Sequence, residues 1–200
     1  MQEHQQELLR TDTSRLRKNH RLLPFPLQFQ QQRPGSTVAL LEGNIGDLTQ
    51  HLLSGVVDFV LDVDDLELPQ FERQFWSREE LLLAVPAHLE VNTTLEAYRL
   101  SFEQARSGLG SDIPRVSLSA FQNENFLLLK KGNDLHRRAL SMCRTAGFKP
   151  QVLMYLDQML TSYHVAENGH GVAFIRSGVL AEQIDSSLII SHEVEYPASQ

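Results

Sequence analysis

Cysteine is nearly missing from this chain of 200 residues, and Cys143 alone cannot form an internal disulfide. Such scarcity is typical of proteins that work in a reducing cytoplasm. Cys143 lies between Leu140 and Ala146 in a helical pattern, so we expect a packed thiol rather than a nucleophile.

Long apolar runs and basic clusters are also lacking. No apolar stretch could span a membrane, and residues 1–10 lack the apolar core of a signal peptide. The formal net charge is −7 and the pI is about 5.6, and no Lys/Arg cluster is interleaved with aromatics. We therefore expect a cytoplasmic protein with no membrane attachment and no nucleic-acid surface of its own.

The familiar signatures of catalysis are absent as well. The sequence has no P-loop, G-x-S-x-G elbow, G-x-G-x-x-G or H-E-x-x-H motif. His164 and His170 flank a predicted helix end without a third ligand at metal-binding spacing. We expect no enzyme, no metal site and no cofactor.

The regular part of the sequence is an alternation between residues 125 and 175. Apolar runs at 126–129, 152–156 and 172–175 predict strands, and helical patterns between them stop at Gly147 and Gly169. Strands that alternate with helices are typical of a parallel sheet, so the predicted fold class is α/β.

The remaining elements complete two α/β lobes. We predict helices at 2–10, 22–32, 45–54 and 179–184, and strands at 37–41, 59–63, 71–76, 80–85 and 188–190. The first lobe covers residues 1–86, the second 87–185, and residues 186–200 return toward the first. Two such lobes predict a cleft that grips a ligand from both sides.

Candidate ligand-binding residues follow the predicted strands. Gly132 permits a close turn, and Asn133 or Asp134 can cap the next helix, whose first N–H groups favour an anion. Simple capping explains this junction without a ligand. Asp157 is explained in the same way, whereas a polar Gln158 at a helix start could hydrogen-bond a ligand.

A family resemblance emerges from an ordered series of segments. They are LLPFPLQFQQQRPGSTVALLEGNIGDLTQHLLSGVVDFVL at 22–61, LLLAVPAH at 81–88, and residues 126–179. The second half contributes Ala146-Gly147-Phe148 and Gly171-Val172-Ala173 in register. The chain thereby resembles the effector-binding domain of LysR-type transcriptional regulators.

The resemblance implies a type 2 periplasmic-binding-protein fold, with two Rossmann-like lobes and an effector cleft between them. By position, the cleft residues are Thr13, Ser14, Arg15, Gly132, Asn133, Asp134, Asp157 and Gln158. The implied effector is a small carboxylate or other anion. The domains of the family pair as homodimers or tetramers, through helices equivalent to 22–32 and 135–146.

The sequence departs from the family in four places. The winged helix-turn-helix through which the family binds DNA is missing, and RTDTSRL at 10–16 replaces the expected first strand. The closing strand is also missing, and Arg176 stands where the family often has proline. Two alternatives remain open: a solute-binding protein of a transporter, and an enzyme built on the same fold.

Overall fold

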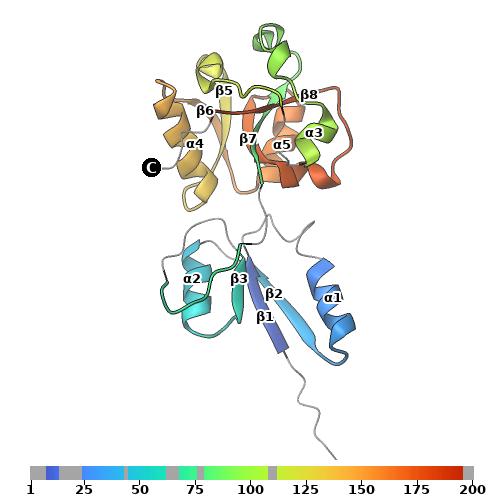
Figure 1. Ribbon diagram of the computed structural model, residues 1–200. Helices are drawn as coiled ribbons and strands as arrows, with labels where there is room; N and C mark the ends of the chain where they lie inside the picture. The colour runs from blue at the N-terminus through green and yellow to red at the C-terminus, as the bar shows by residue number, and fades with distance from the viewer. Residues whose placement is uncertain are drawn as a thin grey trace, which may run out of the picture. The chain divides into compact units, whose positions relative to one another are not determined.

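The computed structural model describes residues 8–13, 24–42, 45–61, 68–75, 79–107 and 112–195. The chain divides into two compact units, Met1–Gln74 and Phe75–Gln200 (Figure 1). Both units combine helices with a sheet, so the α/β prediction is confirmed. The first unit thus ends at Gln74, whereas the first lobe was predicted to extend to residue 86; the extent of the lobes stays a prediction.

The first unit is built on a parallel sheet of three strands in the order β2-β1-β3. Figure 1 shows the sheet between its two helices. The elements are β1 (Leu8–Thr13), α1 (Pro24–Gln32), β2 (Thr37–Glu42), α2 (Ile45–Leu53) and β3 (Phe59–Leu61). Leu48 of α2 is completely buried.

Strand β1 corrects two predictions. Residues 8–10 are extended, not helical, and the first strand that seemed missing is present at Leu8–Thr13. It pairs in parallel with β2 along its whole length and with β3 over its last three residues. Pairing with β2, and with β3 over residues 11–13, therefore determines this strand, since its sequence is no continuous apolar run.

The second unit is built on a sheet of five strands in the order β6-β5-β7-β4-β8. These are β4 (Leu81–Pro86), β5 (Asn125–Leu129), β6 (Gln151–Leu156), β7 (Val172–Arg176) and β8 (Ile189–Glu193). Strand β5 is parallel to β6 and β7, whereas β4 is antiparallel to β7 and β8.

Helices cover this sheet. They are α3 (Phe102–Ser107), α4 (Asp134–Thr145), α5 (Met159–Glu167) and the 3₁₀ helices η2 (Glu90–Thr93), η3 (Glu96–Tyr98), η4 (Leu118–Phe121) and η5 (Ser177–Glu182). Chain order takes β5 to β6 in one direction across the sheet and β6 to β7 in the other. Right-handed crossovers in opposite directions place α4 and α5 on opposite faces.

The core of the second unit centres on Phe126. Its buried ring lies 5.8 Å from the ring of Phe148 and 5.9 Å from that of Phe174. Cys143 of α4 is fully buried, and burial raises its pKa to about 12. The thiol is therefore packed and protonated at neutral pH, as the sequence predicted.

Two further predictions need correction. A strand was predicted at 71–76, but residues 71–75 form no strand and Phe75 is 76% exposed. Residue 76 lies outside the described part. The helix predicted at 179–184 is the 3₁₀ helix η5, which begins at Ser177 directly after β7.

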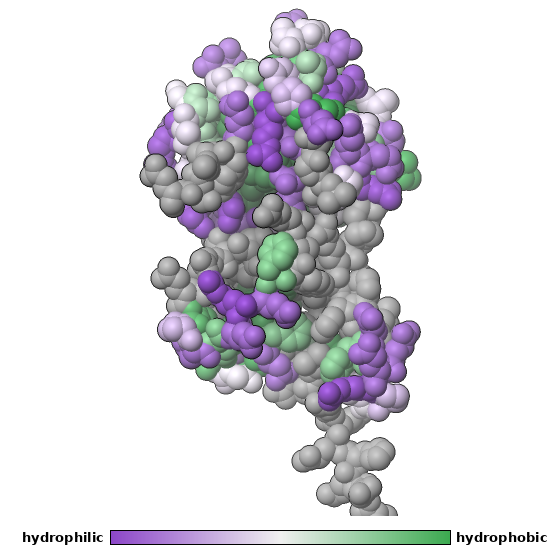
Figure 2. Space-filling view, viewed as in Figure 1, coloured by the Kyte–Doolittle hydropathy of each residue, from purple (hydrophilic) through white to green (hydrophobic). Residues whose placement is uncertain are grey.

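Strand β6 is an edge strand with unusual exposure. Its apolar residues Leu153, Met154 and Tyr155 are 46%, 39% and 53% exposed. Figure 2 shows a visible face of the second unit that is mostly hydrophilic. An exposed apolar edge is a place where another chain can pair.

His192 is the buried titratable group of β8. Its Nδ1 lies 2.9 Å from the backbone oxygen of Tyr98, its ring packs 6.1 Å from that of Phe121, and its buried Nε2 has no hydrogen-bond partner among the described residues. Burial lowers the pKa of His192, the hydrogen bond to Tyr98 opposes that shift, and Arg99 adds to it. The folded state therefore favours neutral histidine.

We predict that stability falls as the pH drops below about 6.5, the pKa of an exposed histidine. Below this pH, the imidazole of His192 binds a proton more readily in the unfolded chain than in the folded chain. Protonation therefore favours unfolding until the pH is below the folded pKa of His192. Thermal melting of wild type and His192→Asn between pH 7.5 and 5 measures the effect. The variant keeps a side-chain donor near Tyr98 and should lose less stability; equal losses contradict the assignment.

Candidate functional site

One edge of the second sheet collects the carboxyl ends of its strands. Strands β5, β6 and β7 run in parallel and end at Leu129, Leu156 and Arg176. Strand β4 begins there, because Leu81 pairs with Arg176, and β8 ends there, because Glu193 pairs with Leu82. Polar groups that follow or end these strands are therefore brought together.

The turn after β5 is shaped by Gly132 and Asn133. Gly132 has a φ of +93°, in the left-handed region where a side chain is strained. Asn133 caps α4, with its Oδ1 accepting a hydrogen bond of 2.9 Å from the backbone N–H of Leu135. Since Asn133 performs the capping, the carboxylate of Asp134 is left for another role.

Asp134 binds two arginines. Its Oδ2 accepts a hydrogen bond from Nη2 of Arg176, at the end of β7, and lies 3.5 Å from Nε of Arg138, one turn along α4. The side chains of Asp134 and Arg176 are only 13% and 12% exposed. Two guanidinium groups thus share one largely buried carboxylate.

The turn after β6 is more open. Asp157 lies 2.8 Å from Nζ of Lys130 in an exposed ion pair that joins the two junctions. Gln158 is the N-cap residue of α5 without a side-chain capping bond, and its backbone oxygen accepts from the N–H of Ser162. Asp157 therefore pairs with lysine and does not cap, which corrects the simpler explanation of that residue.

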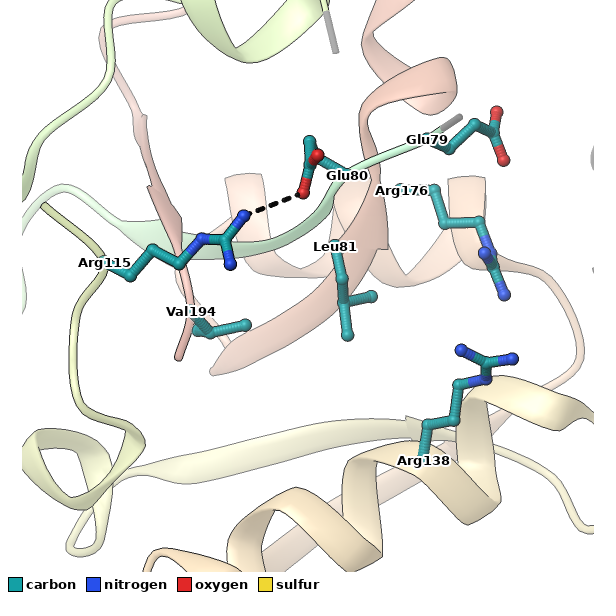
Figure 3. A pocket seen from close by; sticks show the side chains of 7 residues that line it. All are labelled: Glu79, Glu80, Leu81, Arg115, Arg138, Arg176 and Val194. Carbon is teal, nitrogen blue, oxygen red and sulfur yellow. Dashed lines mark hydrogen bonds and ion pairs between the residues drawn. The ribbon is translucent and has the colours of Figure 1, made fainter. Parts of the chain in front are cut away.

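A cavity of about 280 Å³ opens at this edge (Figure 3). It is lined by Glu79, Glu80, Leu81, Arg115, Arg138, Arg176 and Val194. Arg115 lies 3.5 Å from Glu80 and 3.3 Å from Glu193, so it connects the residue before β4 with the end of β8. The cavity is polar, with three arginines and two glutamates in its lining, and guanidinium groups are suited to binding a small anion.

None of the lining residues was a predicted site residue. Arg138 had a usable signal, since it follows Asp134 by four positions on one helix. Arg176 was noted only as a departure from a family pattern. Arg115 gave no signal, because it meets Glu193 across 78 positions of sequence.

The predicted residues are distributed unevenly. Gly132, Asn133, Asp134, Asp157 and Gln158 all lie at this edge. Thr13 is the last residue of β1 in the first unit, and its side chain lies outside the described part, as do Ser14 and Arg15. Their predicted contact with an effector stays a prediction.

The described residues contain no group of three His, Cys, Asp or Glu side chains that could hold a metal ion. No described helix is long and apolar enough to cross a bilayer. The site is thus described by its arginines and carboxylates.

The chain belongs to the family described as the LysR substrate binding domain, whose match covers residues 3–199. This membership supports an effector-sensing regulatory domain and does not favour the solute-binding protein of a transporter. It also agrees with the resemblance seen in the sequence.

A curated relative is the uncharacterized HTH-type transcriptional regulator YcgK of Bacillus subtilis, 27% identical over 149 residues. The match covers 74% of this chain and 46% of YcgK, so the chain spans about half the length of that relative.

Solved structures confirm the fold. HinK, a LysR family regulator from Pseudomonas aeruginosa, has a TM-score of 0.70 at 15% identity, over 96% of this chain and 60% of its own. The BenM effector binding domain with its effector benzoate has a TM-score of 0.68 at 17% identity, and the match covers 96% of this chain and 79% of that one. The CcmR regulatory domain from Synechocystis in complex with 2-PG has a TM-score of 0.73 at 14% identity, and the match covers 95% of this chain and 82% of that one. The type 2 periplasmic-binding-protein fold is confirmed.

We predict that Asp134→Asn destabilises the second unit by on the order of 2–4 kcal/mol, because it leaves two partly buried guanidinium groups without their shared carboxylate. Asp157→Asn is the matched control, since its exposed ion pair contributes less than about 1 kcal/mol. Urea unfolding at one pH and salt concentration measures both. Equal losses in the two variants contradict a structural role for the shared carboxylate.

Proposed function

We propose that this chain senses a small anionic effector at the carboxyl edge of its second sheet. The observation that carries the proposal is the pair of arginines, Arg138 and Arg176, that share Asp134 beside a lined cavity. Two guanidinium groups around one carboxylate retain hydrogen-bond donors, because each guanidinium has five N–H groups. A ligand carboxylate or phosphate is the natural acceptor.

The surroundings favour the same ligand. The first turn of α4 begins at Asp134, so the positive end of its helix dipole lies at this edge. Gly132 keeps the turn before it free of a side chain, which allows close backbone approach. The proposed sensor is therefore built from fixed charges at this edge.

Binding rather than turnover is the proposed role. A guanidinium group is a poor general acid or base, and three of them, Arg115, Arg138 and Arg176, line the cavity. Asp134 and Glu80 are held in ion pairs with those arginines. This arrangement is suited to recognising a charge, in agreement with the family of regulatory domains.

We propose further that the sensor belongs to a bacterial transcription regulator acting in the cytoplasm. A curated relative is an HTH-type regulator of which this chain covers 46%, which supports DNA contact through a helix-turn-helix outside these 200 residues. Effector binding then changes how a dimer or tetramer presents those DNA-binding segments. The prediction that Thr13, Ser14 and Arg15 contribute to the effector site belongs to this proposal.

We predict that Arg176→Gln weakens binding of the tightest small anion by about tenfold or more, because one charge-assisted hydrogen bond is worth about 1.5–3 kcal/mol. Isothermal titration against acetate, succinate, benzoate and inorganic phosphate measures the effect. Arg144→Gln, the same exchange at an exposed position of α4, is the control and should bind like wild type. Absence of binding by all four anions to folded protein contradicts the proposal.

Pairing of two copies is the second part of the proposed function. The family resemblance predicts that two copies pair through the helices at 22–32 and 135–146. Helix α4 lies beside the exposed edge strand β6, because the rings of His136 and Tyr155 are 5.9 Å apart. We propose that β6 joins α4 in this interface, which covers the apolar Leu153 and Met154.

We predict that Leu153→Lys shifts the protein toward monomer in sedimentation velocity, because a charge is placed in an apolar interface. Ile184→Lys is the control, since Ile184 is another exposed apolar residue, outside β6. A monomeric wild type, or an equal shift in both variants, rules out pairing through β6.

A further inference from the structure

The backbone N–H of Arg176, the last residue of β7, donates its hydrogen bond to a side chain and not to a neighbouring strand. The acceptor is Sδ of Met159, 3.0 Å from the nitrogen, and Met159 is only 1% exposed. Methionine sulfur is a weak hydrogen-bond acceptor. Its use at this position therefore depends on what the sheet leaves unpaired at Arg176.

The sheet explains why this N–H is open to a side chain. Arg176 is extended, so the N–H groups of Arg176 and Ser177 point in opposite directions. That of Ser177 donates to the backbone oxygen of Glu80 beside β4, so that of Arg176 points away from β4. On that side the register of β7 with β5 ends at Ala173. A partly buried N–H without an acceptor is costly, and the thioether of Met159 accepts it.

Helix α5 holds the sulfur in place. Met159 is the first residue of α5 and begins a buried stripe that continues with Ser162, Tyr163 and Ala166. This helix packs against β7, and the unbranched chain of methionine can adapt to an irregular gap between them. Since Gln158 is the N-cap residue of the same helix, the turn after β6 is connected directly to the end of β7.

We propose that Met159 is a positioning residue for Arg176. Its sulfur fixes the backbone of Arg176 and so sets the direction in which the guanidinium extends toward Asp134 and the cavity. Because the guanidinium ends a long side chain, a small rotation of the backbone displaces it by much more. This inference rests on the proposed anion-sensing function. Met159 acts through Arg176 and not on the ligand.

The NMR signals of Arg176 test the positioning without a ligand. Met159→Leu keeps a similar apolar volume and removes the sulfur acceptor. In the whole chain, the backbone amide and the side-chain Nε–H of Arg176 should both shift, whereas the amide of Ser177 should shift less, since its acceptor is Glu80. Met142→Leu, the same exchange at a buried position of α4, is the matched control and should leave both signals unchanged. Dispersed spectra confirm that both variants are folded.

Anion binding tests the consequence for the site. Whichever of acetate, succinate, benzoate and inorganic phosphate binds wild type most tightly is titrated calorimetrically into both variants. Met159→Leu should weaken binding by about fivefold, the effect of one typical hydrogen bond, and Met142→Leu should not. In an Arg176→Gln background, Met159→Leu should weaken binding no further, because the guanidinium that it positions is gone.

Each outcome decides a different statement. Unchanged Arg176 signals in Met159→Leu overturn the positioning role, and so does an equal shift in Met142→Leu. Shifted signals with an unchanged anion affinity also overturn it, while anion sensing stands. An undiminished effect of Met159→Leu in the Arg176→Gln background shows that Met159 acts by another route, and the proposal is wrong. If no anion binds wild type, the proposed function falls, and the Arg176 signals alone decide the positioning role.

Discussion

Parallel pairing of β5 with β6 on one side and β7 on the other determines where the polar groups of the second unit meet. Parallel strands end at the same edge, so Asp134 after β5 and Arg176 at the end of β7 are brought into contact although 42 positions separate them. The antiparallel β4 adds Glu80 to the same edge from the opposite chain direction. The cavity follows from this topology.

At that edge, the neighbouring residues Asn133 and Asp134 have different roles. Asn133 caps α4, which leaves Asp134 to hold Arg138 and Arg176 in place. Holding two long cationic side chains on one carboxylate reduces the conformational entropy that a ligand must remove on binding. A stable ion-pair network and a binding surface are therefore the same feature, and removing its carboxylate should affect both.

Much of the fold was predictable because hydrophobic periodicity and glycine stops mark the strands and helices between 125 and 176. Strand β1 was not, because RTDT is polar and only its pairing with β2 and β3 makes it a strand. The junction at Gly132 was predictable from local turn chemistry, and all second-unit candidates lie at one edge. Arg115 and Arg176 were missed because their partners are distant in sequence.

The central claim is that the second unit binds its effector between fixed arginines at the carboxyl edge of its sheet. The most direct test is an NMR titration that follows the side-chain Nε–H signals of arginine in the whole chain as a small carboxylate is added. The account predicts that the signals of Arg138 and Arg176 shift first and saturate together with the backbone amides of residues 132–135. Saturable shifts that leave these two arginines unchanged would contradict it.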